Sequence, residues 1–76
     1  MVLNEHIEVN AAVMAGKPVI RGTRITVEQI LEDLAAGDTP EDLLQAYPRL
    51  KKEHILAALA YAARVLKNET IVEVAA

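Results

Sequence analysis

The apolar positions within residues 1–25 fall in two short runs that predict β-strands. Ile7-Glu8-Val9 and Pro18-Val19-Ile20 are rich in β-branched residues, and a stretch that contains Gly16 separates them. The turn-like sequence Arg21-Gly22-Thr23-Arg24 follows the second run. We therefore expect a short β-strand region at the N-terminus.

From Thr26 onward the spacing of apolar residues changes to that of a helix. Four of them recur at positions i, i+3, i+4 and i+7, namely Val27, Ile30, Leu31 and Leu34. The Thr26 hydroxyl is placed to cap the first turn, and Gln29 has the spacing that completes a capping box. Gly37 tolerates the left-handed conformation that ends a helix.

A second, shorter helix is predicted directly after this glycine. Thr39 is a capping residue and Pro40 follows it at the first helical position, where proline is favoured. Pro48 imposes an extended conformation on the residue before it, so the helix is expected to end near Ala46.

The longest predicted element is a third helix, which begins near Leu50 or Lys51 and runs to about Lys67. Residues 68–76 form a tail whose β-branched part is either a terminal strand or a frayed end. The expected fold is a single mainly α domain over residues 1–76, with a three-helix core over residues 26–67. A short helix joined by a turn to a longer one is typical of a helix-turn-helix of the homeodomain type.

Composition argues against catalysis and against a membrane span. The chain has 76 residues, no cysteine and no serine, and its two histidines, His6 and His54, have neither metal-ligand nor triad spacing. We therefore expect no enzyme activity, no cofactor and no metal. No apolar run reaches the roughly 18 residues of a membrane helix, and the first residues lack the pattern of a secretory signal, so a cytoplasmic protein is expected.

The net charge of −3 conceals three differently charged segments. Residues 1–25 carry three bases and two acids, residues 26–48 carry six acids and no base, and residues 49–76 carry five bases and three acids, which gives +1, −6 and +2. This distribution is either a solvated surface of mixed sign or one face for an anion and another for a basic partner.

The densest group of unusual residues lies between the second predicted strand and the first helix. Its candidate partner-binding or anion-binding residues are Lys17, Arg21, Gly22, Thr23 and Arg24. Backbone amides near the glycine and the two guanidinium groups suit a phosphate or a carboxylate. The alternative is structural: the glycine makes a turn, the threonine caps locally, and the arginines pair with the acidic helices.

The start of the third helix carries the candidate DNA-binding residues Arg49, Lys51, Lys52 and His54. In a helix-turn-helix this segment faces the major groove. The rest of the helix is a poor reader of bases, because between Ile55 and Leu66 only Arg64 is charged.

A helix that is apolar on nearly all sides is expected to be buried. Alanines allow one face of the third helix to pack on the other two helices while the opposite face packs on another chain. We assign Ala58, Tyr61, Ala62 and Val65 to such an oligomer interface, with a homodimer expected. The alternative is that the alanines serve helix propensity alone.

Several strings of the sequence resemble the prokaryotic domain-of-unknown-function family 433. They are Gly16-Lys17-Pro18-Val19-Ile20-Arg21-Gly22-Thr23-Arg24-Ile25, Gly37, Thr39-Pro40-Glu41, Tyr47-Pro48 and Ala57-Ala58-Leu59-Ala60-Tyr61-Ala62. The resemblance spans about residues 6–65. It implies a trihelical, homeodomain-like or winged-helix-like protein that acts as an antitoxin, binds and inhibits a PIN-like ribonuclease and binds operator DNA with it. It implies no catalytic residues.

Two other functions remain open at this point. One is a stand-alone DNA-binding regulator of the helix-turn-helix type, which would depend on the cations that precede the third helix. The other is a dimerisation module whose terminal strands pair across two subunits.

Overall fold

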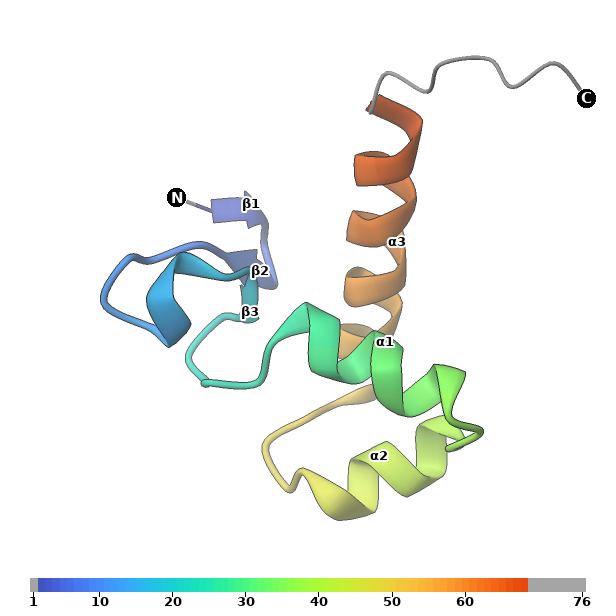
Figure 1. Ribbon diagram of the computed structural model, residues 1–76. Helices are drawn as coiled ribbons and strands as arrows, with labels where there is room; N and C mark the ends of the chain where they lie inside the picture. Colours follow the sequence, from blue (N-terminus) through green and yellow to red (C-terminus); the bar gives the residue numbers. More distant parts are fainter. Residues whose placement is uncertain (1, 69–76) are drawn as a thin grey trace, which may run out of the picture.

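The computed structural model describes residues 2–68, in which three helices stand beside a small N-terminal sheet (Figure 1). The strands are β1 (Val2–Asn4), β2 (Ile7–Glu8) and β3 (Val19–Ile20), paired antiparallel in the order β1-β2-β3. A short 3₁₀ turn, η1 (Met14–Gly16), lies between β2 and β3. The two predicted strands are confirmed, and the mainly α class with an N-terminal β region is confirmed with them.

Strand β1 was not predicted, and a side-chain turn explains how it forms. The Asn4 carboxamide oxygen accepts hydrogen bonds from the backbone N–H groups of His6 at 2.8 Å and Ile7 at 3.0 Å. This local bonding reverses the chain within two residues and places Val2 beside Glu8.

Helix α1 (Val27–Ala35) begins with the predicted cap. The Thr26 hydroxyl accepts a hydrogen bond from the backbone N–H of Gln29 at 3.0 Å. The prediction that the Gln29 side chain bonds back to Thr26 and completes a capping box is wrong. Its amide donates instead to Asp33 Oδ1 at 2.9 Å, one turn along the helix. Gly37, with φ of +106°, follows the last turn as predicted.

Helix α2 (Pro40–Ala46) has the complete capping box that α1 lacks. The Thr39 hydroxyl accepts from the backbone N–H of Asp42 at 3.1 Å, and the Asp42 carboxylate accepts from the backbone N–H of Thr39 at 2.8 Å. The helix ends at Ala46 as predicted. Tyr47, which follows it, donates a hydrogen bond from its hydroxyl to Asp33 Oδ2 at 3.0 Å and so ties the end of α2 to α1.

Helix α3 (Lys52–Asn68) begins slightly later than predicted. His54 explains the starting point, because its Nδ1 atom accepts a hydrogen bond from the backbone N–H of Lys51 at 3.0 Å and satisfies a donor ahead of the first turn. The terminal strand considered for the tail falls in residues 69–76, which lie outside the described residues.

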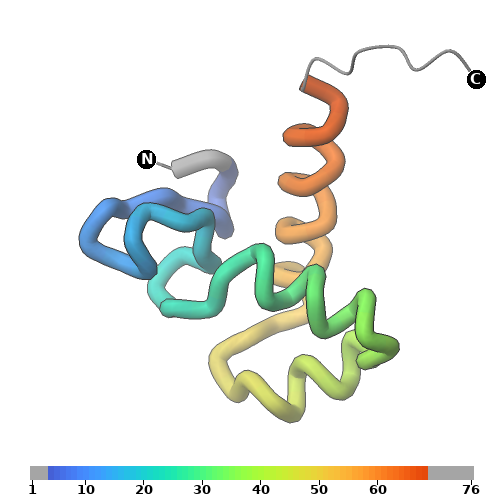
Figure 2. Tube along the Cα trace, in the orientation of Figure 1, coloured from blue at the N-terminus to red at the C-terminus, as the bar shows by residue number. Residues whose placement is uncertain are grey.

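The core lies where the sheet and the three helices meet. Its buried members are Ile7, Ile20, Val27, Ile30, Leu43, Leu50, Ile55 and Ala58. From α3, only the buried residues Ile55 and Ala58 belong to it, both in the N-terminal half of that helix. The trace in Figure 2 shows the C-terminal end of α3 projecting away from α1 and α2. One face of α3 therefore packs on the rest of its own chain, as expected, and residues 63–68 of the helix are exposed.

Candidate protein-binding groove

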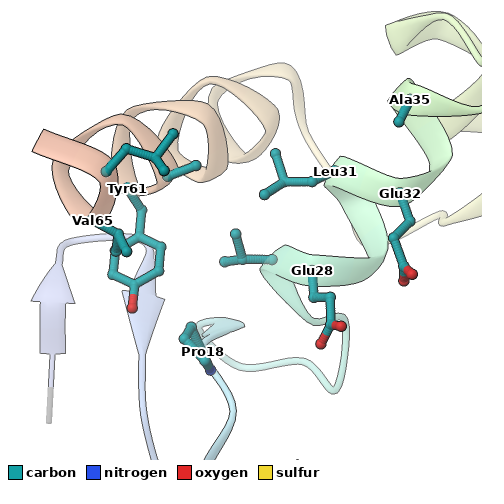
Figure 3. Close-up of a pocket in the computed structure, with 10 residues that line it drawn as sticks. Pro18, Glu28, Leu31, Glu32, Ala35, Tyr61 and Val65 are labelled. Atoms are coloured by element: carbon teal, nitrogen blue, oxygen red, sulfur yellow. The ribbon is translucent and has the colours of Figure 1, made fainter. Parts of the chain in front are cut away.

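An open groove of about 530 Å³ separates α1 from the C-terminal half of α3 (Figure 3). One wall is made by Val27, Leu31 and Ala35, which follow one another at four-residue intervals along α1. The apolar residues of the other wall come from α3 and are Tyr61, Ala62, Val65 and Leu66. Residues four apart lie on one face of a helix, so two apolar rows face each other across the groove.

Burial increases toward the floor of this groove and falls toward its mouth. Val27 is buried, Leu31 and Tyr61 are half-buried, and the side chains of Val65 and Leu66 at the mouth are 43% and 60% exposed. Leu31 and Tyr61 also pack against the core, so the floor of the groove is fixed by the fold. Large apolar side chains left open to water in this way are typical of an interaction surface.

The α1 edge of the groove is acidic. Glu28 and Glu32 are both exposed and leave the helix on the same side, as Figure 3 shows. Glu28 forms an ion pair with Lys17, whose Nζ lies 3.2 Å from Glu28 Oε1. Because both side chains are more than half exposed, solvent and salt screen this pair and it contributes little to stability.

Residues 17–24 include some groups that form a turn and some side chains that are exposed to solvent. Thr23 is structural: its hydroxyl donates to the Ile20 carbonyl at 2.8 Å and accepts from the Ile25 backbone N–H at 3.0 Å. Gly22 has φ of +80°, which the turn requires. Among the described residues, the cation of this segment that pairs with α1 is Lys17, whereas the side chains of Arg21 and Arg24 are exposed and make no ion pair.

Of the predicted DNA-binding residues, three are exposed and one has a structural role. Arg49, Lys51 and Lys52 are exposed ahead of α3 and in its first turn. His54 is partly buried, caps the helix, and packs its ring edge to face against His6. Two effects lower the pKa of His54 below its usual range, of which burial is the larger and the neighbouring His6 the smaller. The ring is therefore a neutral structural group at neutral pH.

The four residues assigned to an oligomer interface all lie on the inner side of α3. Ala58 is fully buried in the core of its own chain, so its assignment to an interface is wrong. Tyr61, Ala62 and Val65 line the groove. Among the residues on α3 that sequence analysis did not single out, Leu56 and Leu59 are exposed.

Within residues 2–68, no three histidine, cysteine or carboxylate side chains are grouped so that they could hold a metal ion. No helix in this part of the chain is long and apolar enough to cross a membrane. The groove has apolar walls and one acidic edge.

Comparison with known proteins places this arrangement in a family. The family described as "Protein of unknown function (DUF433)" matches residues 7–62. The chain belongs to this family. The match begins at β2 and ends in α3 at Ala62, so the DUF433 region includes the α1 wall of the groove and part of the α3 wall.

This DUF433 domain is also similar to one curated protein and to one solved structure. It is 42% identical over 50 residues to "Uncharacterized protein y4eO" of Sinorhizobium fredii, covering 66% of this chain and 23% of that protein, so it spans about a quarter of the curated relative. A crystal structure of a DUF433 member protein from Anabaena variabilis superposes with a TM-score of 0.79 at 31% identity, covering 86% of this chain and 64% of that one. The predicted resemblance to the family is confirmed.

Proposed function

We propose that this DUF433 domain is the antitoxin of a prokaryotic toxin–antitoxin pair, and that it binds and inhibits a PIN-like ribonuclease through the α1–α3 groove. The observation that carries the proposal is the groove itself, in which two apolar rows face each other and remain open to solvent. An antitoxin of this kind needs a preformed contact surface and no catalytic group. This surface and the family resemblance support the same function.

The shape of the groove suits an amphipathic helix of the ribonuclease. Rows of side chains at four-residue intervals on α1 and α3 form the grooves into which the ridge of a third helix packs. Glu28 and Glu32 on one edge favour basic residues along the same side of that helix. The expected ligand is therefore a helix with an aliphatic ridge and lysine or arginine beside it.

Inhibition of the nuclease is proposed to depend on Arg21 and Arg24. A nuclease of this class holds its metal ion with carboxylates, and an exposed guanidinium group placed among them competes with the metal for the same charge. Both arginines are exposed, which this role requires. A second route is mimicry of RNA phosphates by the acids of α1, of which Glu28 and Glu32 are exposed.

The experiment is co-expression with the product of the neighbouring gene, followed by co-purification and an RNA-cleavage assay. Val65→Glu places a carboxylate at the mouth of the groove, and the expected result is loss of the complex and recovery of RNA cleavage. Arg64→Glu is the matched control, because Arg64 is exposed on the same helix and does not line the groove. Equal inhibition by the two variants would contradict the groove as the binding site.

The same assay separates the two routes of inhibition. Charge reversal at Arg21 and Arg24 is expected to relieve inhibition while the complex still forms, and neutralisation of Glu28 and Glu32 to glutamine tests phosphate mimicry. If the double arginine reversal leaves inhibition intact, the arginines do not reach the metal site.

A second candidate function is DNA binding, either with the nuclease or alone. It is favoured by the exposed cations Arg49, Lys51 and Lys52 at the N-terminal end of α3, which make no ion pair within residues 2–68. In a helix-turn-helix these residues would contact phosphates near the major groove. His54 does not join them, because its ring caps the helix.

A further inference from the structure

Helix α3 carries an exposed apolar strip, and three of its four residues belong neither to the core nor to the groove. We call it the outer strip and define it as Leu56, Leu59, Ala63 and Leu66. All four residues are exposed, and the three leucines are 57%, 43% and 60% exposed in order. Only Leu66, at the end of the strip, also touches the groove.

The spacing of the outer strip is that of a coiled-coil seam. Its residues follow one another at intervals of three, four and three, which corresponds to alternating a and d positions of a heptad. Each residue comes one position after an inward-facing residue of α3 (Ile55, Ala58, Ala62 and Val65). One position is about 100° around a helix, so the strip lies on a different face of α3 from the inward-facing residues and is open to a partner of its own.

We propose that the outer strip pairs antiparallel with the outer strip of a second copy of this chain, across a two-fold axis near the middle of α3. This register places Leu56 opposite Leu66 of the second copy and Leu59 opposite Ala63 of the second copy. By symmetry each contact occurs twice. The small Ala63 leaves room for the larger Leu59 of the facing helix, so the central layers are complementary in size.

Charge on the flank of the strip determines the direction of pairing. Glu53, Ala60 and Lys67 lie on one edge of the strip at seven-residue intervals, with the acid near the start of the helix and the base near its end. Antiparallel pairing about the axis brings Ala60 beside Ala60 of the second copy and each Glu53 beside a Lys67. Two ion pairs then close the ends of the seam.

The same two charges do not pair within one helix, because 14 residues extend over about 21 Å. In a parallel pair, the edge with Glu53 and Lys67 would face the opposite edge of the other helix, which holds Ile55 and Ala62 and has no charge. Only the antiparallel arrangement gives each charge a partner of opposite sign. The occupant of the outer strip is therefore a second copy, and this proposal does not depend on the nuclease-binding role of the groove.

The test is sedimentation velocity of this chain over a wide range of concentrations, with far-UV circular dichroism as the check on folding. The mass of two chains is expected. Leu59→Glu is expected to give a monomer with unchanged helix content, because Leu59 lies outside the core.

Charge reversal tests the direction of pairing. Glu53→Lys alone and Lys67→Glu alone each replace two attractions with two repulsions and are expected to weaken dimerisation about tenfold or more. The double variant exchanges the signs, restores both ion pairs and is expected to regain the dimer. Arg64→Glu, which changes an exposed charge outside the seam, is expected to have no such effect.

Three results would overturn the proposal. The first is a wild-type chain that stays monomeric at every concentration. The second is a dimer that survives Leu59→Glu. The third is a dimer that either single charge reversal leaves intact, or that the double reversal fails to rescue, because such a dimer would not pair α3 in this register.

Discussion

The imidazole rings of His6 and His54 meet edge to face, with centroids 5.1 Å apart and planes inclined at 76°. His6 lies in the turn between β1 and β2, and His54 lies in the first turn of α3, so the contact joins the sheet to the start of the longest helix. His54 Nδ1 also accepts the backbone N–H of Lys51, and this role requires that nitrogen to be unprotonated.

This contact predicts a loss of stability in mild acid. Burial and then His6 lower the pKa of His54 in the folded chain, so the unfolded chain binds a proton at a pH where the folded chain does not. The contribution is fully present above the unfolded pKa of about 6.5 and is lost as pH falls through the lower folded pKa. The urea midpoint is therefore expected to decrease between about pH 7.5 and pH 5.5.

His54→Gln provides the control for this prediction. Glutamine three residues after a cap can accept the same backbone N–H and does not titrate. The variant is expected to keep its midpoint at neutral pH and to lose less stability in acid than the wild-type chain. An acid loss as large as that of the wild type would assign the effect to other groups.

The centre of the core is predicted to depend on Ile30. Its side chain is fully buried where α1 meets the rest of the core. Ile30→Ala removes three carbon atoms and leaves a cavity, so we expect a loss of about 2–5 kcal/mol in the free energy of unfolding, against about 0.5–1.5 kcal/mol for Ile30→Val. Chemical denaturation measures both, and equal losses would show that the site collapses around the smaller side chain.

The capping box of α2 predicts a linked effect of Thr39 on stability and titration. Thr39→Ala removes the hydroxyl that caps the helix and is expected to lower the melting temperature by about 5 °C, whereas Thr39→Ser retains the cap.

Hydrogen bonds from the Thr39 backbone and then from its side chain hold the pKa of Asp42 below its ordinary value of 3.8. The stability supplied by Asp42 is therefore present above 3.8 and is lost as pH falls through its lower folded pKa.

An NMR titration of Asp42 checks the same capping box independently. Thr39→Ala is expected to raise the pKa of Asp42 part of the way to its ordinary value, since the backbone N–H of residue 39 remains. A pKa that does not move would show that the hydroxyl has no part in the shift.

DNA binding makes a prediction about salt. If the cations before α3 bind phosphates, replacing Lys51 and Lys52 with alanine is expected to lower the affinity for all DNA sequences alike. The slope of log affinity against log salt concentration is expected to decrease by about one for each phosphate that is no longer neutralised. Fluorescence anisotropy with duplex DNA at several salt concentrations measures this slope. An unchanged slope would show that these two lysines do not bind DNA, and Arg64→Ala serves as the control for a distant cation.

The elements whose signals are local could be predicted from the amino-acid sequence. The caps at Thr26 and Thr39, the glycine after α1 and the proline after α2 each act within a few residues, and all four mark real helix boundaries. Strand β1 was missed because its turn depends on the Asn4 side chain rather than on a glycine or proline.

The groove and the outer strip could not be assigned from spacing alone. Helix α3 is apolar on both sides, so Ala58 and Leu59, one position apart, were equally good candidates for the core. The position of α1 and the sheet decides between them, because it buries Ala58 completely and leaves Leu59 43% exposed. The contact between His6 and His54 was also beyond sequence analysis, because 47 intervening residues must fold before the two rings meet.

The most direct test of the central proposal is a map of where the nuclease binds. Amide and methyl chemical shifts of the labelled domain are measured as the proposed nuclease partner is added. The groove predicts that the largest changes occur at Leu31, Tyr61 and Val65, with smaller changes at Glu28 on its edge. Changes confined to the cations at residues 49–52, or none at all, would contradict the groove as the binding site.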